Sequence, residues 1–254
     1  MEKLPGVPAT NDLHLMKMDE IKSLFFEVCA EARHMMDFRF DSFGAINPFG
    51  DLGPLTDFDT CRDFLVAELH YLIKKIMATK NESIEPHVLR RLEEYVLKHV
   101  SVFDNEVSCF AHDDLIWFNV LHEGPHLTGL IDFDLDTKMP PSQILHWILL
   151  ALHHPWSGPR DGDNVYFPNL QHLHLCNELL PIARRAFPDV FADQLLVRKM
   201  NILRIVWRLR IFCYAIPAWM TQLTRMLETE VPDTVALLDD SFYGKLLREG
   251  GCSC

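Results

Sequence analysis

The residues of this sequence best suited to act together in catalysis lie between 112 and 132. His112, Asp114 and Asn119 fall within one short segment, and Asp132 follows further along the chain. Carboxylate and amide oxygens are the hard ligands that Mg²⁺ requires, and Mg²⁺ keeps further positions open for phosphate oxygens. A carboxylate that does not bind the metal can accept the proton of a hydroxyl group. This set is the minimal equipment for phosphoryl transfer, in which catalysis consists mostly of positioning and charge neutralisation.

A β-hairpin is the element that must bring these side chains together. Two short apolar runs, Phe118–Leu121 and Leu127–Ile131, are separated by a polar linker that contains one glycine and one proline. This pattern predicts two antiparallel strands joined by a tight turn. The hairpin places Asn119, near the start of the first strand, beside Asp132, at the end of the second strand.

Each of these residues then has an expected role. Asn119 and Asp132 are expected to hold Mg²⁺, and Asp114 to accept or orient the hydroxyl proton. His112 is expected to fix the shape of the loop through a backbone hydrogen bond. The alternative explanation is turn chemistry, because Asp and Asn favour loops and strand ends for backbone reasons alone.

The motif resembles that of a known family. Residues 112–119 read His-Asp-Asp-Leu-Ile-Trp-Phe-Asn, and residues 131–134 read Ile-Asp-Phe-Asp. The aminoglycoside phosphotransferase and choline kinase-like family, which has a protein kinase-like fold, reads His-x-Asp-x-x-x-x-Asn. Two strands follow in that family, and the second ends in Ile-Asp-aromatic-acidic. Asp134 matches the acidic position after the aromatic residue.

The resemblance implies a role for each matched residue. By it, Asp114 is the catalytic base, Asn119 and Asp132 are the magnesium ligands, and His112 supports the catalytic loop. ATP is then the co-substrate, and the acceptor is a hydroxyl group of a small molecule. Asp113 stands where the family is permissive, so no role is assigned to it.

The resemblance covers residues 1–140 and implies only the C-terminal lobe of the protein kinase-like fold. Gly6 is the single glycine before Gly44, so no glycine-rich phosphate loop precedes the catalytic segment. The N-terminal ATP-binding lobe is therefore expected to be absent. An uncovered apolar face would favour self-association or a partner chain. The alternatives to an active kinase are an inactive kinase-like binding module and a fragment of a longer kinase.

The periodicity of the chain predicts a mainly helical α+β fold, organised as a single domain over 1–254. A catalytic-loop region at 108–136 is followed by a helical remainder at 141–248 and a flexible tail at 249–254. Residues 1–16 and 37–58 are expected to be irregular, and Asp59 is expected to cap the second helix. Helices are expected over 18–36, 59–78, 86–100, 142–153, 169–186, 190–212, 217–229 and 232–248.

Composition narrows the range of partners and compartments. The chain has 36 acidic and 24 basic residues, a net charge of -12, which argues against nucleic acid as a partner. The seven cysteines form neither a disulfide framework nor a zinc motif, which favours a reducing, cytoplasmic setting. No apolar stretch predicts an integral membrane segment, because charged residues or His146 interrupt each one. The terminal Cys252-Ser-Cys254 resembles a prenylated tail, although a frayed end with incidental cysteines explains it better.

A second enzyme class also contains a His-Asp pair. In metal-dependent phosphohydrolases such a pair acts with further histidines on helices, and His146, His153 and His154 follow on an expected helix. The pair at 112–113 precedes strands, however, which argues against this class. His146 is better explained as an amphipathic or core histidine.

Overall fold

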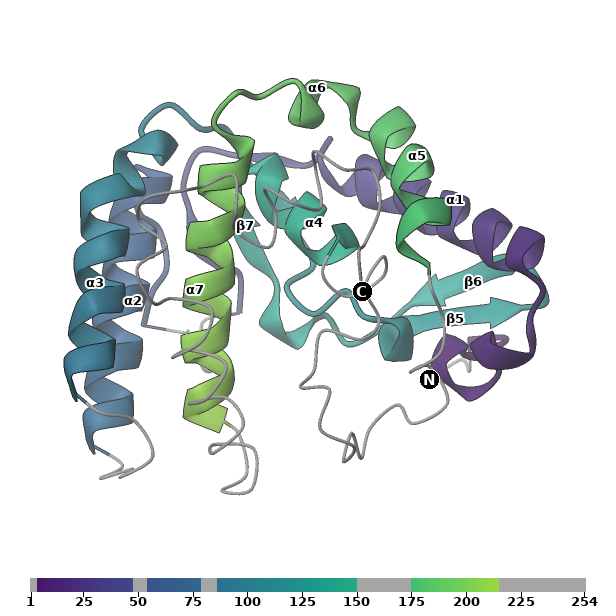
Figure 1. The fold of residues 1–254 in the computed structure, drawn as a ribbon, viewed down its shortest axis with the longest axis horizontal. Helices are drawn as coiled ribbons and strands as arrows, with labels where there is room; N and C mark the ends of the chain where they lie inside the picture. Colours follow the sequence, from purple (N-terminus) through teal and green to yellow (C-terminus); the bar gives the residue numbers. More distant parts are fainter. Residues whose placement is uncertain (1–3, 48–53, 79–85, 150–174, 215–254) are drawn as a thin grey trace.

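The structure is a computed structural model that describes residues 4–47, 54–78, 86–149 and 175–214. It confirms the mainly helical α+β class. Figure 1 shows α2, α3 and α7 on the left, β7 and α4 in the middle, and α1 and α5 above β5 and β6 on the right. The helices are α1 Met18–Met35, α2 Cys61–Ala78, α3 Pro86–His99, α4 Pro141–Trp147, α5 Cys176–Ala186, α6 Pro188–Phe191 and α7 Leu196–Tyr214.

Two small antiparallel sheets carry the centre of the fold. The first has the strand order β1-β5-β6, and the second has the order β2-β4-β7-β3. The strands are β1 Val7–Pro8, β2 Arg39–Phe40, β3 Gly44–Ala45, β4 Ser108–Ala111, β5 Val120–Glu123, β6 His126–Leu130 and β7 Thr137–Met139. Strands β5 and β6 form the predicted hairpin, with Val120 opposite Leu130. The first of these strands begins later than predicted, because Trp117–Asn119 forms a 3-10 turn.

Two segments expected to be irregular contribute strands. Strands β2 and β3 lie within the predicted loop 37–58 and pair with β4 and β7. Strand β1 lies within the predicted irregular segment 1–16 and pairs with β5. Each of these strands has only two residues, which is too short for an alternating pattern to appear in the sequence.

The first three helices agree with their predicted ranges, but some boundaries differ. Thr60, not Asp59, caps α2, since its Oγ1 accepts a hydrogen bond from the backbone N of Asp63 at 3.1 Å. The single helix expected over 190–212 is two helices, α6 and α7. Asp193 separates them, because its carboxylate accepts from the backbone N of Leu195 at 2.8 Å and its carbonyl accepts from the N of Leu196.

Other predictions lie wholly or partly outside the described residues. These include the helices over 217–229 and 232–248, the tail with Cys252 and Cys254, and parts of the ranges 142–153 and 169–186. Within the part of the chain that the structure describes, every helix is too short or too polar to cross a membrane.

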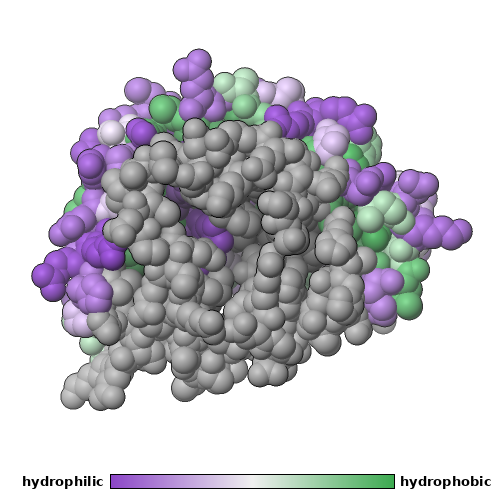
Figure 2. Space-filling model, in the orientation of Figure 1, coloured by the Kyte–Doolittle hydropathy of each residue, from purple (hydrophilic) through white to green (hydrophobic). Residues whose placement is uncertain are grey.

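The core forms where helices pack on the sheets and on each other. Helix α1 packs against α5 and β6, and α7 packs against α2 and α4. In α1 the buried residues Ile21, Leu24, Phe25 and Val28 fall at helical spacing, as the periodicity predicts. Figure 2 shows mostly hydrophilic side chains on the left of that view, over α2 and α3, and a mixture of hydrophilic and apolar side chains on the right.

Gly6 is fixed by both its backbone conformation and its neighbours. Its φ of +94° is disfavoured for other residues, and a Cβ there would lie 2.3 Å from Thr128 Oγ1 and 2.8 Å from the carbonyl oxygen of His122. Gly124 also has a positive φ, +56°, but no atom lies within 4 Å of a Cβ at that position. The two glycines therefore separate the effect of a close contact from that of backbone strain.

We predict that Gly6→Ala lowers the free energy of unfolding by about 3 kcal/mol, because strain and a backbone clash combine. Gly124→Ala should cost about 1 kcal/mol, because only the left-handed backbone is strained. Urea-induced unfolding followed by circular dichroism measures both values. Equal losses in the two variants would contradict the close approach of Gly6 to β5.

Candidate functional site

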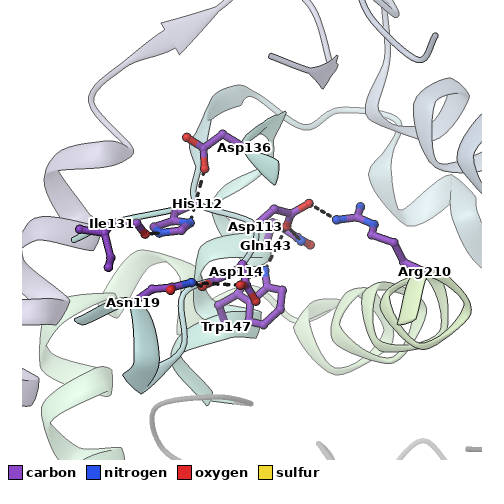
Figure 3. Close-up of polar contacts among 9 residues, drawn as sticks. All are labelled: His112, Asp113, Asp114, Asn119, Ile131, Asp136, Gln143, Trp147 and Arg210. Atoms are coloured by element: carbon purple, nitrogen blue, oxygen red, sulfur yellow. Dashed lines mark hydrogen bonds and ion pairs between the residues drawn. The ribbon is translucent and has the colours of Figure 1, made fainter. Parts of the chain in front are cut away.

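The loop between β4 and β5 holds three consecutive polar residues with three different anchors. Figure 3 shows His112 directed towards Ile131 and Asp136, Asp113 directed towards Arg210, and Asp114 beside Asn119. The first anchor is the end of the hairpin, the second is the interior of the helical part, and the third is the start of β5. The loop is thus held from several sides.

His112 links the loop to the end of the hairpin. Its Nε2 donates to the carbonyl oxygen of Ile131 at 3.0 Å, which is the kind of backbone hydrogen bond that the sequence predicts. Its Nδ1 lies 3.4 Å from Oδ1 of the buried Asp136. Burial lowers the pKa of His112, and burial together with the charge of Asp113 raises the pKa of Asp136 to about 8. At pH 7 both groups are therefore expected to be uncharged.

Asn119 holds Asp114 at two points. Its Nδ2 donates to the backbone carbonyl oxygen of Asp114 at 2.8 Å and to the Asp114 carboxylate at 3.0 Å. The pKa of Asp114 is raised to about 7, mainly by burial and in smaller part by the charges of Asp132 and Asp113, while the hydrogen bond from Asn119 opposes the shift. Asp114 is only half-buried, so it remains in contact with solvent. A carboxylate with such a pKa can both take up and release a proton near pH 7.

Asp132 comes directly after the second strand of the hairpin. The backbone N of Ile131 donates to the carbonyl oxygen of Asn119 at 3.0 Å, which brings the start of β5 and the end of β6 together. Asp132 itself has a φ of 64°, which is the left-handed conformation, and its side chain is exposed. An exposed acidic residue held in this conformation is a frequent feature of functional sites.

Two side chains at the end of the hairpin, those of Asn119 and Asp132, carry oxygens of the kind that bind magnesium. Asn119 offers an amide oxygen and Asp132 an exposed carboxylate, and Mg²⁺ is commonly held in proteins by one or two side chains plus phosphate oxygens and water. The described residues contain no group of three His, Cys, Asp or Glu side chains placed to hold a metal ion. His146 is fully buried, as expected of a core histidine, whereas His153 and His154, the other histidines of the phosphohydrolase alternative, lie outside the described residues.

Asp113, to which the sequence analysis gave no role, is the most strongly bonded residue of the loop. Its buried carboxylate accepts hydrogen bonds from Trp147 Nε1 at 3.0 Å, from Gln143 Nε2 and from Arg210. Although burial opposes ionisation, Arg210 and these hydrogen bonds lower the pKa of Asp113. Asp113 therefore carries a negative charge in the interior of the protein.

Arg210 is shared by two buried carboxylates. Its Nε donates to Glu68 Oε1 at 2.8 Å, while its other nitrogens reach both Glu68 and Asp113. The sequence contained one signal of this cluster, since arginines interrupt the otherwise apolar segment 202–220. A charged residue on the buried face of a helix requires a partner, although the sequence does not show which one.

Comparison with known proteins supports the fold. Protein-family models give no match to this sequence, and none of the curated proteins matches it. Among solved structures, the ADP-bound aminoglycoside phosphotransferase APH(2'')-Ib aligns with a TM-score of 0.52 and 14% identity, over 91% of this chain and 70% of that chain. A thermostable mutant of aminoglycoside phosphotransferase APH(4)-Ia, in a ternary complex with AMP-PNP and hygromycin B, aligns with a TM-score of 0.53 and 14% identity, over 92% and 72%.

These alignments show that the chain has the fold of the aminoglycoside phosphotransferases, as the motif predicted. This protein kinase-like fold defines the class to which the structure belongs. A choline kinase from Cryptosporidium parvum Iowa II aligns less well, with a TM-score of 0.44 and 12% identity, and adds nothing to the fold assignment.

We predict that Arg210→Met lowers the free energy of unfolding by about 3–5 kcal/mol, because it leaves two buried carboxylates without their cation. The matched control is Arg33→Met, since Arg33 pairs with Asp189 at 2.7 Å where both side chains are partly exposed to solvent. That substitution should cost less than about 1 kcal/mol. Urea unfolding of both variants tests the difference, and similar losses would show that the buried cluster is not a stabilising unit.

We predict a characteristic pH dependence from His146, because burial lowers its pKa to about 3. Below the ordinary histidine pKa of 6.5, the unfolded chain binds a proton that the folded chain does not. His146 therefore lowers stability as the pH falls, by about 1.4 kcal/mol per pH unit. Other groups titrate over the same range, so the informative quantity is the stability of His146→Phe minus that of the wild type. This difference should increase steadily from pH 6 to pH 4, and a constant difference would contradict the neutral buried ring.

Proposed function

We propose that this protein is a phosphotransferase that moves the γ-phosphoryl group of ATP to a hydroxyl group of a small molecule. The observation that carries the proposal is the arrangement of Asp114, Asn119 and Asp132. Asn119 bonds directly to Asp114, and the charge of Asp132 acts on Asp114. A half-buried proton acceptor thus lies beside the buried amide group of Asn119, and the exposed carboxylate of Asp132 is near enough for its charge to act on that acceptor.

In this proposal Asp114 accepts the proton of the acceptor hydroxyl. The hydroxyl oxygen forms a bond to the γ-phosphorus while the bond from that phosphorus to the bridging oxygen breaks, and ADP leaves with the bonding electron pair. The raised pKa of Asp114 suits a group that accepts a proton in one step and releases it to solvent afterwards. Asn119 keeps the carboxylate directed into the site through its hydrogen bond.

Asn119 and Asp132 are the residues that would hold Mg²⁺. The amide group of Asn119 has separate donor and acceptor ends, so its nitrogen can bond to Asp114 while its oxygen serves as a ligand. When bound, Mg²⁺ would neutralise charge on the phosphate oxygens. His112 supports this arrangement, because its hydrogen bond to Ile131 fixes the backbone next to Asp132.

The structural neighbours support the choice of co-substrate. The solved APH(2'')-Ib structure is ADP-bound, and an APH(4)-Ia structure contains AMP-PNP together with hygromycin B. By analogy, we infer that a nucleotide and a small hydroxyl compound bind here, with the chain acting as one domain. A reducing compartment such as the cytoplasm fits the free thiols of Cys29, Cys61 and Cys109.

We predict that Asp114→Asn lowers kcat for phosphoryl transfer by about 10²- to 10⁴-fold, because the proton acceptor is lost. Nucleotide binding should persist in this variant. Asp132→Asn should instead remove the gain in ATP affinity that Mg²⁺ provides, because a metal ligand is lost. Transfer is measured with radiolabelled ATP and a panel of amino alcohols and sugars, and binding is measured by calorimetry with and without EDTA.

The control for both variants is Asp37→Asn, which makes the same chemical change at an exposed position at the end of α1. It should leave transfer and binding unchanged. Wild-type levels of transfer in Asp114→Asn would exclude the proposed base. Nucleotide binding without transfer in the wild type, unaffected by Asp132→Asn, would favour a kinase-like binding module.

A further inference from the structure

We propose that Asp113 is a positioning residue, which sets the direction of Asp114 by anchoring the catalytic loop to helices α4 and α7. The inference rests on the proposed function, because it concerns the residue expected to accept the proton. It assigns a role to a position at which the sequence motif places no requirement. Three features of the structure support this role: neighbouring side chains are held by different elements, the buried anchor is costly to rearrange, and a second carboxylate outside the loop bonds to the same guanidinium group.

The first feature is that adjacent side chains are held by different elements. The Asp113 carboxylate accepts from Gln143 and Trp147 of α4 and from Arg210 of α7. The next residue, Asp114, is held by Asn119 through both its carbonyl oxygen and its carboxylate. Because one peptide unit joins the two residues, a rotation of the backbone at Asp113 must also turn Asp114. The buried anchor therefore limits the directions available to the proton acceptor.

The second feature is that the anchor is costly to rearrange. Asp113 is 1% exposed, and its three donors come from residues that are themselves buried. A charged carboxylate in such a place must keep its partners, since moving it away would leave Arg210 and the indole nitrogen of Trp147 without this acceptor. The loop conformation is thus tied to the packing of α4 against α7 (Figure 3).

The third feature supplies a matched control. Glu68 of α2 lies on the other side of Arg210 and bonds to the same guanidinium group. Removing either carboxylate leaves Arg210 with one remaining carboxylate partner. Glu68 does not belong to the catalytic loop. A purely stabilising cluster predicts similar consequences for both truncations, whereas a positioning role predicts consequences at the site only for Asp113.

The test compares Asp113→Ala with Glu68→Ala by two measurements. The first is hydrogen exchange of the side-chain amide protons of Asn119, observed by nitrogen-15 NMR, which reports on the bond to Asp114 without any substrate. The second is steady-state phosphoryl transfer with ATP. In Asp113→Ala the Asn119 protons should exchange at least tenfold faster. In that variant kcat should fall at least tenfold, and KM for ATP should stay within threefold of wild type. Glu68→Ala should stay within threefold of wild type in each quantity.

A milder variant allows the proposal to be tested even if Asp113→Ala fails to fold. Asp113→Asn retains an acceptor oxygen for Trp147 and Gln143, so its exchange rate and kcat should fall between those of the alanine variant and the wild type. The proposal is overturned if both Asp113 variants retain wild-type exchange at Asn119, or if Glu68→Ala changes exchange and kcat to the same extent. Absence of transfer in the wild type would refute the proposed function alone, because the exchange measurement still decides whether Asp113 positions the loop.

Discussion

The candidate site depends on the register of one hairpin. The hydrogen bond from the Ile131 nitrogen to the Asn119 carbonyl oxygen closes the open end of β5 and β6, where Asn119 and Asp132 come together. A shift of one residue in this register would turn the side chains of one strand to the opposite face. Val120, Leu121 and His122 of β5 are all buried, so this strand is covered on both of its faces by the surrounding protein. The chemistry of the site is therefore a consequence of how the hairpin packs.

Charge is distributed differently on the two sides of the loop. On the solvent side, Asp132 is exposed, and within the described residues no lysine or arginine forms an ion pair with it. On the interior side, Asp113 is compensated by a guanidinium group and two neutral donors. Asp114 stands between these environments, which explains why burial and Asp132 together raise its pKa. Acidic residues that are neighbours in the sequence thus have distinct physical properties.

The sequence predicts those parts of the structure that are local. The hairpin, the helices and the contact of His112 with the backbone follow from patterns that extend over a few residues. The contact between Asp113 and Arg210 joins positions 97 residues apart, and no local pattern can indicate such a pairing. The same reason applies to β2 and β3, whose partners are far along the chain. Asp113 was overlooked because the motif compares positions in sequence, whereas the role of this residue arises from burial.

The pairing of β1 with β5 has a practical consequence for experiments. Val7 lies opposite His122, so the beginning of the described chain is attached to the same strand that starts next to Asn119 (Figure 1). An affinity tag or a fluorescent label joined upstream of Leu4 would be tethered to the strand that leads into the site. Labels at this end are suited to reporting ligand arrival, whereas assays of turnover are better served by a tag that can be cleaved off.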